Sequence, residues 1–222
     1  MDRVAVIGAG PLGLSAMKNL KEEGFDVTGF EARGFVGGIW HCSTDSALSV
    51  TEKTIFNSSR YRSAFSDYPF DDDVDAFPTW QQLDKYLNGY CDHFDLRPHI
   101  QLNSRITNVM REEKQWVLEV SSKNKPARLE RFDRIVVATG SFVQPKVPKF
   151  DGMELFQGRK IHAMDFQTPS MYDGQNVLIV GLHATTQDVA KVLHGHAKKL
   201  YLAHKSGVLL VRLSPRFQFM QR

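Results

Sequence analysis

The sequence predicts an α/β fold made of two Rossmann-like domains, the first of which carries an antiparallel β-meander insertion. Two segments, 3–31 and 176–203, each have the order strand, glycine turn, helix and strand. Between them, residues 100–133 alternate polar and apolar side chains, as antiparallel strands do. A stretch punctuated by Pro145 and Pro148 is typical of a linker. We therefore expect a first domain at 1–144 and an incomplete second domain at 145–222.

The first βαβ unit is expected within residues 3–31. Residues 3–7 are apolar and β-branched, which predicts a buried parallel strand. A helix is predicted over 12–23 and ends at Gly24, and a second strand follows at 25–31. The buried stripe of the helix is expected to hold Leu12, Ala16, Met17 and Leu20.

The remaining elements follow in order along the chain. Residues 43–78 are rich in Ser, Asp, Thr and Pro with interspersed aromatics, which indicates ordered irregular structure. Thr79 is a suitable N-cap for a helix over 80–94. The meander is predicted as strands at 100–109, 114–121 and 127–133 with a turn at 123–126, followed by another buried strand at 134–139. The second βαβ unit is predicted as a strand at 176–180, a helix at 185–194 and a strand at 199–203.

Composition and charge exclude several classes of protein. The 222 residues carry a formal net charge of +3, which is too small to indicate a nucleic acid or an anionic membrane as partner. Cys42 and Cys91 are too few for a disulfide framework or a four-cysteine zinc site, and they lack C-x-x-C spacing. No apolar run reaches the length of about 18 residues that a membrane span needs, and the N-terminus does not resemble a signal peptide. We expect a soluble, cytoplasmic protein without a metal site.

Gly8, Gly10 and Gly13 form the pattern G-A-G-P-L-G between the first strand and the first helix. In a dinucleotide site the first glycine permits the tight turn, the second lets backbone approach a pyrophosphate, and the third lets the helix pack on the strand. The helix N-terminus offers N–H groups to the phosphates. Glu31 closes the next strand and is expected to accept hydrogen bonds from ribose hydroxyls, which disfavours a 2′-phosphate here. The alternative is a strand–turn–helix with incidental glycines.

Two further glycine segments favour FAD as the dinucleotide of this first site. Gly37 and Gly38 follow Glu31 closely, and the A-T-G sequence at 138–140 ends a predicted strand, so both bring unhindered backbone to a long ligand. Both could alternatively be glycine turns at a sheet edge. The residues expected to contact FAD are Gly8, Gly10, Pro11, Gly13, Glu31, Arg33, Gly38, Ile39, Trp40, Ile106, Thr139 and Gly140.

These motifs resemble those of the flavin-containing monooxygenases, which belong to the class B flavoprotein monooxygenases. The resemblance covers nearly the whole chain. Its most specific part is the signature F-x-G-x-x-x-H-x-x-x-[YF], which Phe156, Gly158, His162 and Phe166 fill. The other motifs are G-A-G-P-L-G at 8–13, E-A-R at 31–33, G-G-I-W at 37–40, F-N-S-S-R at 56–60, F-S-D-Y-P-F at 65–70 and A-T-G at 138–140.

The resemblance implies an enzyme that uses FAD and NADPH to oxygenate a small molecule with dioxygen. NADPH reduces FAD, and a flavin hydroperoxide then transfers oxygen to a soft nucleophile such as an amine or a sulfide. Asn57 is implied to face the flavin as the one catalytic residue, although it could be a turn asparagine. His162 is implied to link the two domains without chemistry of its own, and it could be a satisfied interdomain histidine.

Two other functions stay open, and the substrate is not readable from the sequence. One is Baeyer–Villiger oxygenation of ketones; Phe166 counts against it, because the resemblance leads us to expect Trp there in those enzymes. The other is a dinucleotide-binding chain with little or no activity. Self-association into a homo-oligomer is compatible with the sequence.

The second glycine turn departs from the dinucleotide pattern. Gly181 keeps the first position, while His183 and Thr186 occupy the second and third. His183 is expected to crowd a pyrophosphate, and Thr186 to weaken the packing of helix on strand. The helix N-terminus is still available to a phosphate, and a basic segment after the second strand suits a 2′-phosphate, although it could be a solvated loop. NADPH is expected to contact Gly181, Thr185, His204 and Lys205.

The chain stops at Arg222, just after the second strand of the second unit, whereas members of the resembled family continue and return to the flavin domain. The chain is a fragment, or it is naturally short, or another chain supplies the rest. A reactive flavin needs a site that excludes water and keeps NADP docked. We therefore expect the 222-residue chain alone to oxidise NADPH slowly and to release hydrogen peroxide in place of oxygenated product.

Overall fold

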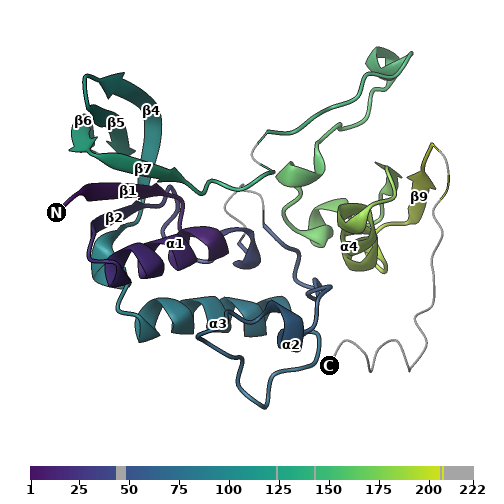
Figure 1. Cartoon of the computed structure of the whole chain (residues 1–222). Coiled ribbons are helices and arrows are strands. Elements are labelled where there is room, and N and C mark those ends of the chain that lie inside the picture. Colours follow the sequence, from purple (N-terminus) through teal and green to yellow (C-terminus); the bar gives the residue numbers. More distant parts are fainter. Residues whose placement is uncertain (44–48, 124, 143, 206, 208–222) are drawn as a thin grey trace. The chain divides into compact units, whose positions relative to one another are not determined.

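A computed structural model describes residues 1–43, 49–123, 125–142, 144–205 and 207. The chain divides into two units that are each held by internal contacts (Figure 1). The first unit comprises Met1–His41 and Leu83–Val143, and the second comprises Cys42–Gln82 and Gln144–Arg222. The division into domains at 1–144 and 145–222 stays a prediction.

A parallel sheet forms the centre of the first unit. Its strands are β1 (Arg3–Ile7), β2 (Asp26–Phe30), β3 (Ile100–Gln101) and β7 (Arg134–Val137), in the order β3-β2-β1-β7. β1 is central, and its residues Val4, Ala5 and Val6 are fully buried. The predicted α/β class is confirmed. The prediction that β7 is a buried strand was wrong, because β7 lies at the sheet edge and leaves Val137 65% exposed.

Helix α1 (Pro11–Glu22) connects β1 to β2 and covers one face of the sheet (Figure 1). The predicted buried stripe was wrong at Leu12, which is 76% exposed. The helix instead buries Gly13, Leu14, Met17 and Lys18. The reason is a close fit at Gly29 of β2, where a Cβ atom would lie 2.4 Å from the Met17 sulfur. With Met17 against the sheet, Leu12, five residues earlier, lies about 140° away around the helix and faces outward.

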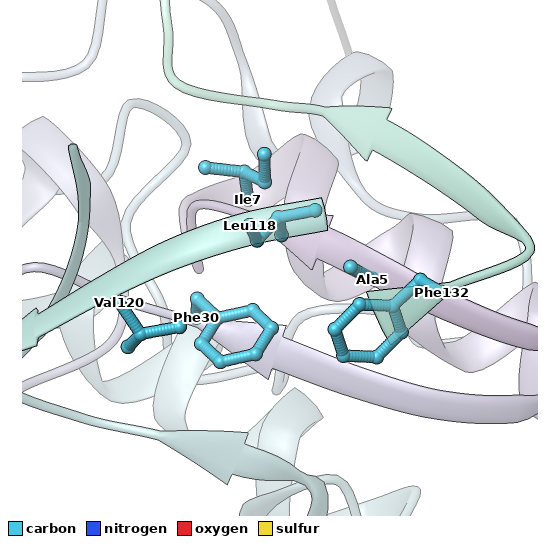
Figure 2. Packing of buried hydrophobic residues seen from close by; sticks show 6 residues of the cluster. All are labelled: Ala5, Ile7, Phe30, Leu118, Val120 and Phe132. Carbon is cyan, nitrogen blue, oxygen red and sulfur yellow. The ribbon is translucent and has the colours of Figure 1, made fainter. Parts of the chain in front are cut away.

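The antiparallel meander covers the other face of the sheet. It consists of β4 (Ser104–Glu112), β5 (Gln115–Ser122) and β6 (Lys125–Phe132). Phe132 meets Phe30 of β2 edge to face, with ring centroids 5.7 Å apart, and Figure 2 shows the shared core. The core residues are Ala5, Ile7, Phe30, Leu118, Val120 and Phe132.

The predicted first meander strand, 100–109, divides into two strands in different sheets. Ile100–Gln101 pairs in parallel with β2 as β3, and the chain then turns at Asn103, whose φ is 52°, before β4 begins. Alternation of polar and apolar residues does not reveal this change of partner. The predicted turn at 123–126 includes residue 124, which lies outside the described residues, and Pro126 lies within β6.

Helix α3 (Trp80–His93) is the second helix of this region and lies beside α1 in Figure 1. It buries Leu83, Tyr86, Leu87, Tyr90 and Cys91. Thr79 and Gln82 cap its start reciprocally: Thr79 Oγ1 accepts from the Gln82 N–H at 3.3 Å, and Gln82 Oε1 accepts from the Thr79 N–H at 2.9 Å. The predicted cap is confirmed.

The second unit contains the second βαβ motif. Strands β8 (Asn176–Val180) and β9 (Lys199–Ala203) pair in parallel, and α4 (Ala184–Leu193) connects them. Its core is formed by Tyr172, Val189 and Leu193, with Phe166 packed against them. The short elements of the chain are α2 (Arg60–Ser63), η1 (Gly38–Trp40), η2 (Arg97–His99), η3 (Met153–Leu155), η4 (Ala163–Asp165) and η5 (Pro169–Tyr172). None of the helices in the described part of the chain is long and apolar enough to cross a bilayer.

Candidate functional site

The first glycine turn lies directly against the end of β7. Gly8 has a φ of +106°, and its N–H donates to the Phe30 carbonyl at 2.7 Å. A Cβ atom on Gly8 would lie 2.5 Å from the Ala138 carbonyl oxygen and 3.4 Å from Thr139 Cα. Only glycine fits here, on grounds of both conformation and space. The G-A-G and A-T-G motifs, 130 residues apart in the sequence, therefore meet at the carboxyl ends of β1 and β7, a place that we call the glycine edge.

Gly13 and Gly10 are required for different reasons. A Cβ atom on Gly13 would lie 1.9 Å from the Gly8 carbonyl oxygen, so this glycine lets α1 rest on the turn. Gly10 is the N-cap of α1 with φ −74° and ψ −177°, a conformation open to any residue. Within the described residues, a Cβ atom on Gly10 would meet only the backbone of Gly38, at 3.6 Å. The absence of a side chain at Gly10 thus leaves space at the start of α1.

Glu31 anchors the turn. Its carboxylate is buried and accepts two backbone hydrogen bonds, from the Ala9 N–H and the Arg33 N–H, both at 2.9 Å. The sequence predicted only a ribose contact for Glu31 and carried no signal for this second role. Each carboxylate oxygen has a further lone pair, so a ribose hydroxyl can still donate to it.

The loop from Gly37 to Trp40 completes the edge. The Gly37 N–H donates to the Ala9 carbonyl at 2.9 Å, and a Cβ atom on Gly38 would lie 3.1 Å from Gly10 Cα. Arg33 Nη1 donates to the Gly38 carbonyl at 3.2 Å. The structure therefore brings the two glycine segments into contact, backbone against backbone. These observations fit a dinucleotide whose pyrophosphate lies over glycine backbone at a helix N-terminus.

The remaining predicted FAD contacts are defined by their positions and exposure. Pro11 is the first residue of α1, and Ile39 and Trp40 are half-buried in η1. Thr139 and Gly140 are exposed after β7, with Gly140 at φ 85°. Ile106 packs against the meander core, and its cofactor contact stays a prediction.

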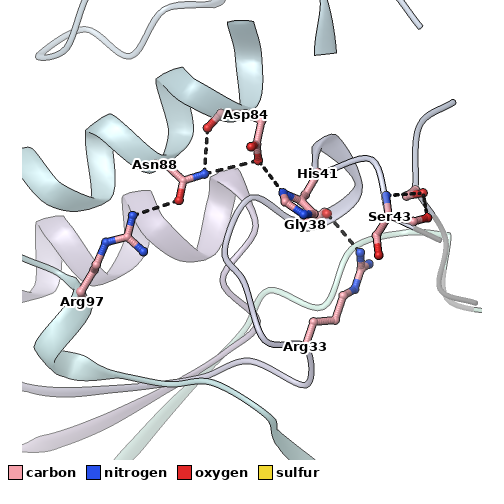
Figure 3. A network of polar contacts seen from close by, with 8 residues as sticks. Arg33, Gly38, His41, Ser43, Asp84, Asn88 and Arg97 are labelled. Atoms are coloured by element: carbon pink, nitrogen blue, oxygen red, sulfur yellow. Dashed lines mark hydrogen bonds and ion pairs between the residues drawn. The ribbon is translucent and has the colours of Figure 1, made fainter. Parts of the chain in front are cut away.

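A polar network that the sequence analysis did not single out holds the same loop on its other side. His41 Nδ1 lies 3.0 Å from Asp84 Oδ1 of α3, as Figure 3 shows. The two residues are 43 positions apart in the sequence, and neither is part of a motif named above. The one available signal was the position of His41 directly after the G-G-I-W motif.

The second glycine turn has the same backbone path as the first. The Gly181 N–H donates to the Ala203 carbonyl at 2.8 Å, which matches the bond from Gly8 to the end of β2. His183 is the N-cap of α4 with φ −94° and ψ −174°, close to the values at Gly10. The fold thus accepts a side chain at this position, and that of His183 is exposed. Whether it crowds a pyrophosphate stays a prediction.

Thr186 occupies the position of the third glycine as a buried residue. It is 7% exposed, and its Oγ1 would lie 3.4 Å from a Cβ atom on Gly181, an ordinary contact distance. Thr185 is exposed in the first turn of α4. After β9, His204 Nδ1 accepts from the Gly207 N–H at 2.8 Å, which fixes one ring nitrogen in a local turn, while Lys205 is exposed.

The signature motif at 156–166 has local structural roles. Phe166 stacks on Tyr172 with ring centroids 5.6 Å apart and so belongs to the core of the second unit. His162 caps η4, because its Nδ1 accepts from the Met164 N–H at 3.1 Å. A Cβ atom on Gly158 would lie 2.4 Å from the Phe156 ring. In these contacts Phe166 and Gly158 pack against aromatic rings, and His162 caps a short helix.

Asn57 lies in an exposed bend of the second unit, and its catalytic role stays a prediction. Three residues earlier, Thr54 is buried, and its Oγ1 donates to Asp188 Oδ2 of α4 at 2.9 Å. The segment is also held by a bond from the Phe56 N–H to the Pro78 carbonyl at 2.8 Å. The Thr54–Asp188 contact joins the Asn57 segment to the helix of the second glycine turn, and no motif in the sequence predicted it.

The two cysteines are both free. Burial raises the pKa of the Cys91 thiol to about 11. Burial, together with the nearby Glu52 carboxylate, raises the pKa of the Cys42 thiol. Both changes disfavour the reactive thiolate, which agrees with the exclusion of a dithiol redox mechanism.

Comparisons with known proteins agree with this geometry. The profile of a family described as flavin-binding monooxygenase-like matches residues 1–216. A monooxygenase named aurF from Gibberella zeae is 38% identical over 94% of this chain and 40% of its own length. The rat dimethylaniline monooxygenase [N-oxide-forming] 4 is 32% identical over 92% of this chain and 38% of its own length. This chain thus spans about 40% of the length of these curated relatives.

A solved structure shows the same fold. The S-allyl-L-cysteine S-oxygenase from Allium sativum superposes with a TM-score of 0.84 at 25% sequence identity. The match covers 96% of this chain and 54% of that enzyme.

Proposed function

The chain belongs to the flavin-binding monooxygenase-like family, and from that premise we propose that the whole protein is an FAD- and NADPH-dependent monooxygenase of amines or sulfides. The observation that carries the proposal is the glycine edge of the first unit, where Gly8, Gly10 and Gly38 present backbone beside the start of α1. Its relatives include an enzyme named for N-oxide formation and one named for S-oxygenation, which supports soft nucleophiles as substrates.

The first site is proposed to hold FAD. The N–H groups at the start of α1 would bind the pyrophosphate, since the space at Gly10 is left open by the missing side chain. Glu31 would accept a ribose hydroxyl while it keeps the Ala9 and Arg33 N–H groups fixed. When bound, FAD supplies the oxygen chemistry and NADPH the electrons.

The second site is proposed to hold NADPH. Gly181 and Thr185 would contact its phosphates at the start of α4, and Lys205 would pair with the 2′-phosphate after β9. His204 would contribute less, since its Nδ1 already accepts the Gly207 N–H. Asn57 would face the flavin and donate from its side-chain amide to a reacting oxygen.

Other functions are less well supported. Phe166, which packs on Tyr172 in the core, carries no feature that favours Baeyer–Villiger chemistry. A partly inactive dinucleotide-binding chain remains the alternative, because His183 replaces a glycine. We also propose that the protein is cytoplasmic and that it acts on dioxygen and a small-molecule substrate. Light scattering would decide whether it is a homo-oligomer.

The visible spectrum of the purified 222-residue chain tests the first site. We expect bound FAD in the wild type and a colourless protein for Gly10→Val, because the larger side chain would occupy the space over the start of α1. Gly24→Ala, at an open position after α1, is a control with no neighbour to disturb, although its φ of +82° adds some strain. Full flavin occupancy in Gly10→Val would contradict the assignment.

A further inference from the structure

The loop Gly37–His41 is fixed at both ends. The glycine turn fixes one end, and the His41–Asp84 contact, which no sequence motif includes, fixes the other. We propose that His41 and Asp84 form a positioning pair that sets the affinity for FAD by fixing this loop, without contacting the pyrophosphate themselves. The inference rests on the proposed flavin site and adds two residues to it.

The pair itself is well oriented and partly shielded from solvent. His41 Nδ1 lies 3.0 Å from Asp84 Oδ1, and the two side chains are 32% and 20% exposed. A carboxylate only accepts hydrogen bonds, so Nδ1 carries the hydrogen. Phe35 stacks on the His41 ring with centroids 3.9 Å apart, which fixes the plane of the imidazole.

Asp84 is in turn oriented from the side of α3 (Figure 3). Asn88, one helical turn later, donates from Nδ2 to Asp84 Oδ1 at 3.3 Å and to the Asp84 carbonyl at 2.9 Å. Asn88 Oδ1 accepts from Arg97 Nη2 at 2.9 Å. A chain of polar contacts thus runs from Arg97 through Asn88 and Asp84 to His41, so the carboxylate has little freedom to leave the imidazole.

The other end of the loop is held by the glycine turn. The Gly37 N–H donates to the Ala9 carbonyl at 2.9 Å, and Gly38 lies against Gly10. Asp84 reaches this end as well, because a Cβ atom on Gly37 would lie 3.4 Å from its Oδ1. Gly38, Ile39 and Trp40, which we propose as FAD contacts, therefore lie between two fixed points. Loss of the His41–Asp84 pair would release one of them and leave the glycine turn intact.

FAD titration of variants tests the pair. We expect His41→Phe, which keeps the stack on Phe35, and Asp84→Ala each to raise the FAD dissociation constant by up to about tenfold. The limit is the factor for one good hydrogen bond, because a loop released from that bond must be ordered again when FAD binds. The double variant should bind FAD no more weakly than either single variant, because both single changes remove the same interaction. Asp84→Asn, which keeps an oxygen acceptor of the same size, should bind FAD within about twofold of the wild type.

A second pair of the same type provides the matched control. His196 Nδ1 lies 2.6 Å from Asp173 Oδ1 in the second unit. Asp173→Ala removes a histidine–aspartate contact far along the chain from the glycine edge, and we expect unchanged FAD affinity.

Hydrogen exchange on the flavin-free proteins gives a readout that does not depend on the cofactor. The amides of residues 37–41 should exchange faster in His41→Phe and Asp84→Ala, while those of β1 keep their rates. If the wild type binds FAD and both variants match it in affinity and exchange, the inference fails and the proposed function stands. If the wild type binds no FAD, the proposed function fails and the inference fails with it.

Discussion

Gly13 and Gly10 belong to one motif, and the structure predicts opposite consequences when each becomes alanine. A Cβ atom on Gly13 would lie 1.9 Å from the Gly8 carbonyl oxygen and 2.9 Å from its carbon, whereas real Cβ atoms essentially never come within 3.0 Å. Both clashing atoms are backbone and cannot rotate away. The start of α1 would therefore have to move from the turn by about 1.1 Å.

The expected cost follows from this displacement. Overpacking of this kind costs roughly 1–3 kcal/mol, and a clash with fixed backbone belongs at the upper end. The better helix propensity of alanine returns up to about 1 kcal/mol, which leaves a loss of about 2 kcal/mol. For a chain of this size that loss lowers the melting temperature by roughly 4–8 °C.

Gly10→Ala should behave in the opposite way. Its new methyl group would meet Gly38 at 3.6 Å, an ordinary contact, so stability should fall by no more than about 1 kcal/mol through the poorer N-cap. The same methyl group projects into the space proposed for the pyrophosphate, so this variant should lose the most FAD.

Thermal unfolding of the flavin-free variants, followed by circular dichroism, and FAD titration of each give the two rankings. We expect Gly13→Ala to be the less stable variant and Gly10→Ala to be the weaker FAD binder. A Gly13→Ala protein as stable as the wild type would refute the close approach of helix and turn. A Gly10→Ala protein that binds FAD normally would refute the position of the pyrophosphate.

Four further predictions concern other parts of the chain. Lys205→Ala should weaken NADPH binding about tenfold or more, because one charge-assisted contact to the 2′-phosphate is lost, and should leave NADH binding nearly unchanged. Equal effects in titrations with both cofactors would show that Lys205 does not bind the 2′-phosphate. In the native protein at pH 8, Cys91 should resist alkylation because its pKa is about 11, while the half-buried Cys42 reacts slowly, as mass spectrometry of the labelled chain would reveal. Because folding raises the Cys91 pKa, its contribution to stability is complete below about pH 8.5 and is lost as the pH rises towards 11. Asp188→Ala should lower the unfolding free energy by about 1–1.5 kcal/mol, because the buried Thr54 hydroxyl loses its charged acceptor and keeps, among the described residues, only Thr51 Oγ1, at 3.0 Å, as an acceptor. Asp188→Asn should retain most of the wild-type stability, and equal urea midpoints for wild type and Asp188→Ala would contradict the prediction.

Much of the fold was predictable because it depends on local pattern. The apolar runs of β1 and β8, the helices that follow them and the glycines between them are readable within about 30 residues of sequence. The spacing of Gly8, Gly10 and Gly13, with Glu31 after the next strand, indicated a dinucleotide site from the same short segment. Periodicity specified that a helix follows β1, yet it assigned Leu12 to the wrong face.

The interactions that assemble the site depend on contacts between distant residues, and only the tertiary structure decided them. The fit of Met17 against Gly29 chooses the buried face of α1, and pairing of Ile100–Gln101 with β2 divides a stretch that looks like one strand. Glu31 holds the Ala9 N–H in addition to its predicted role toward a ribose, and His41 meets Asp84 across 43 positions. The sequence by itself determined which segments become strands, helices and glycine turns, because those preferences are local; packing alone determined which side chains meet, because a contact depends on two surfaces at once.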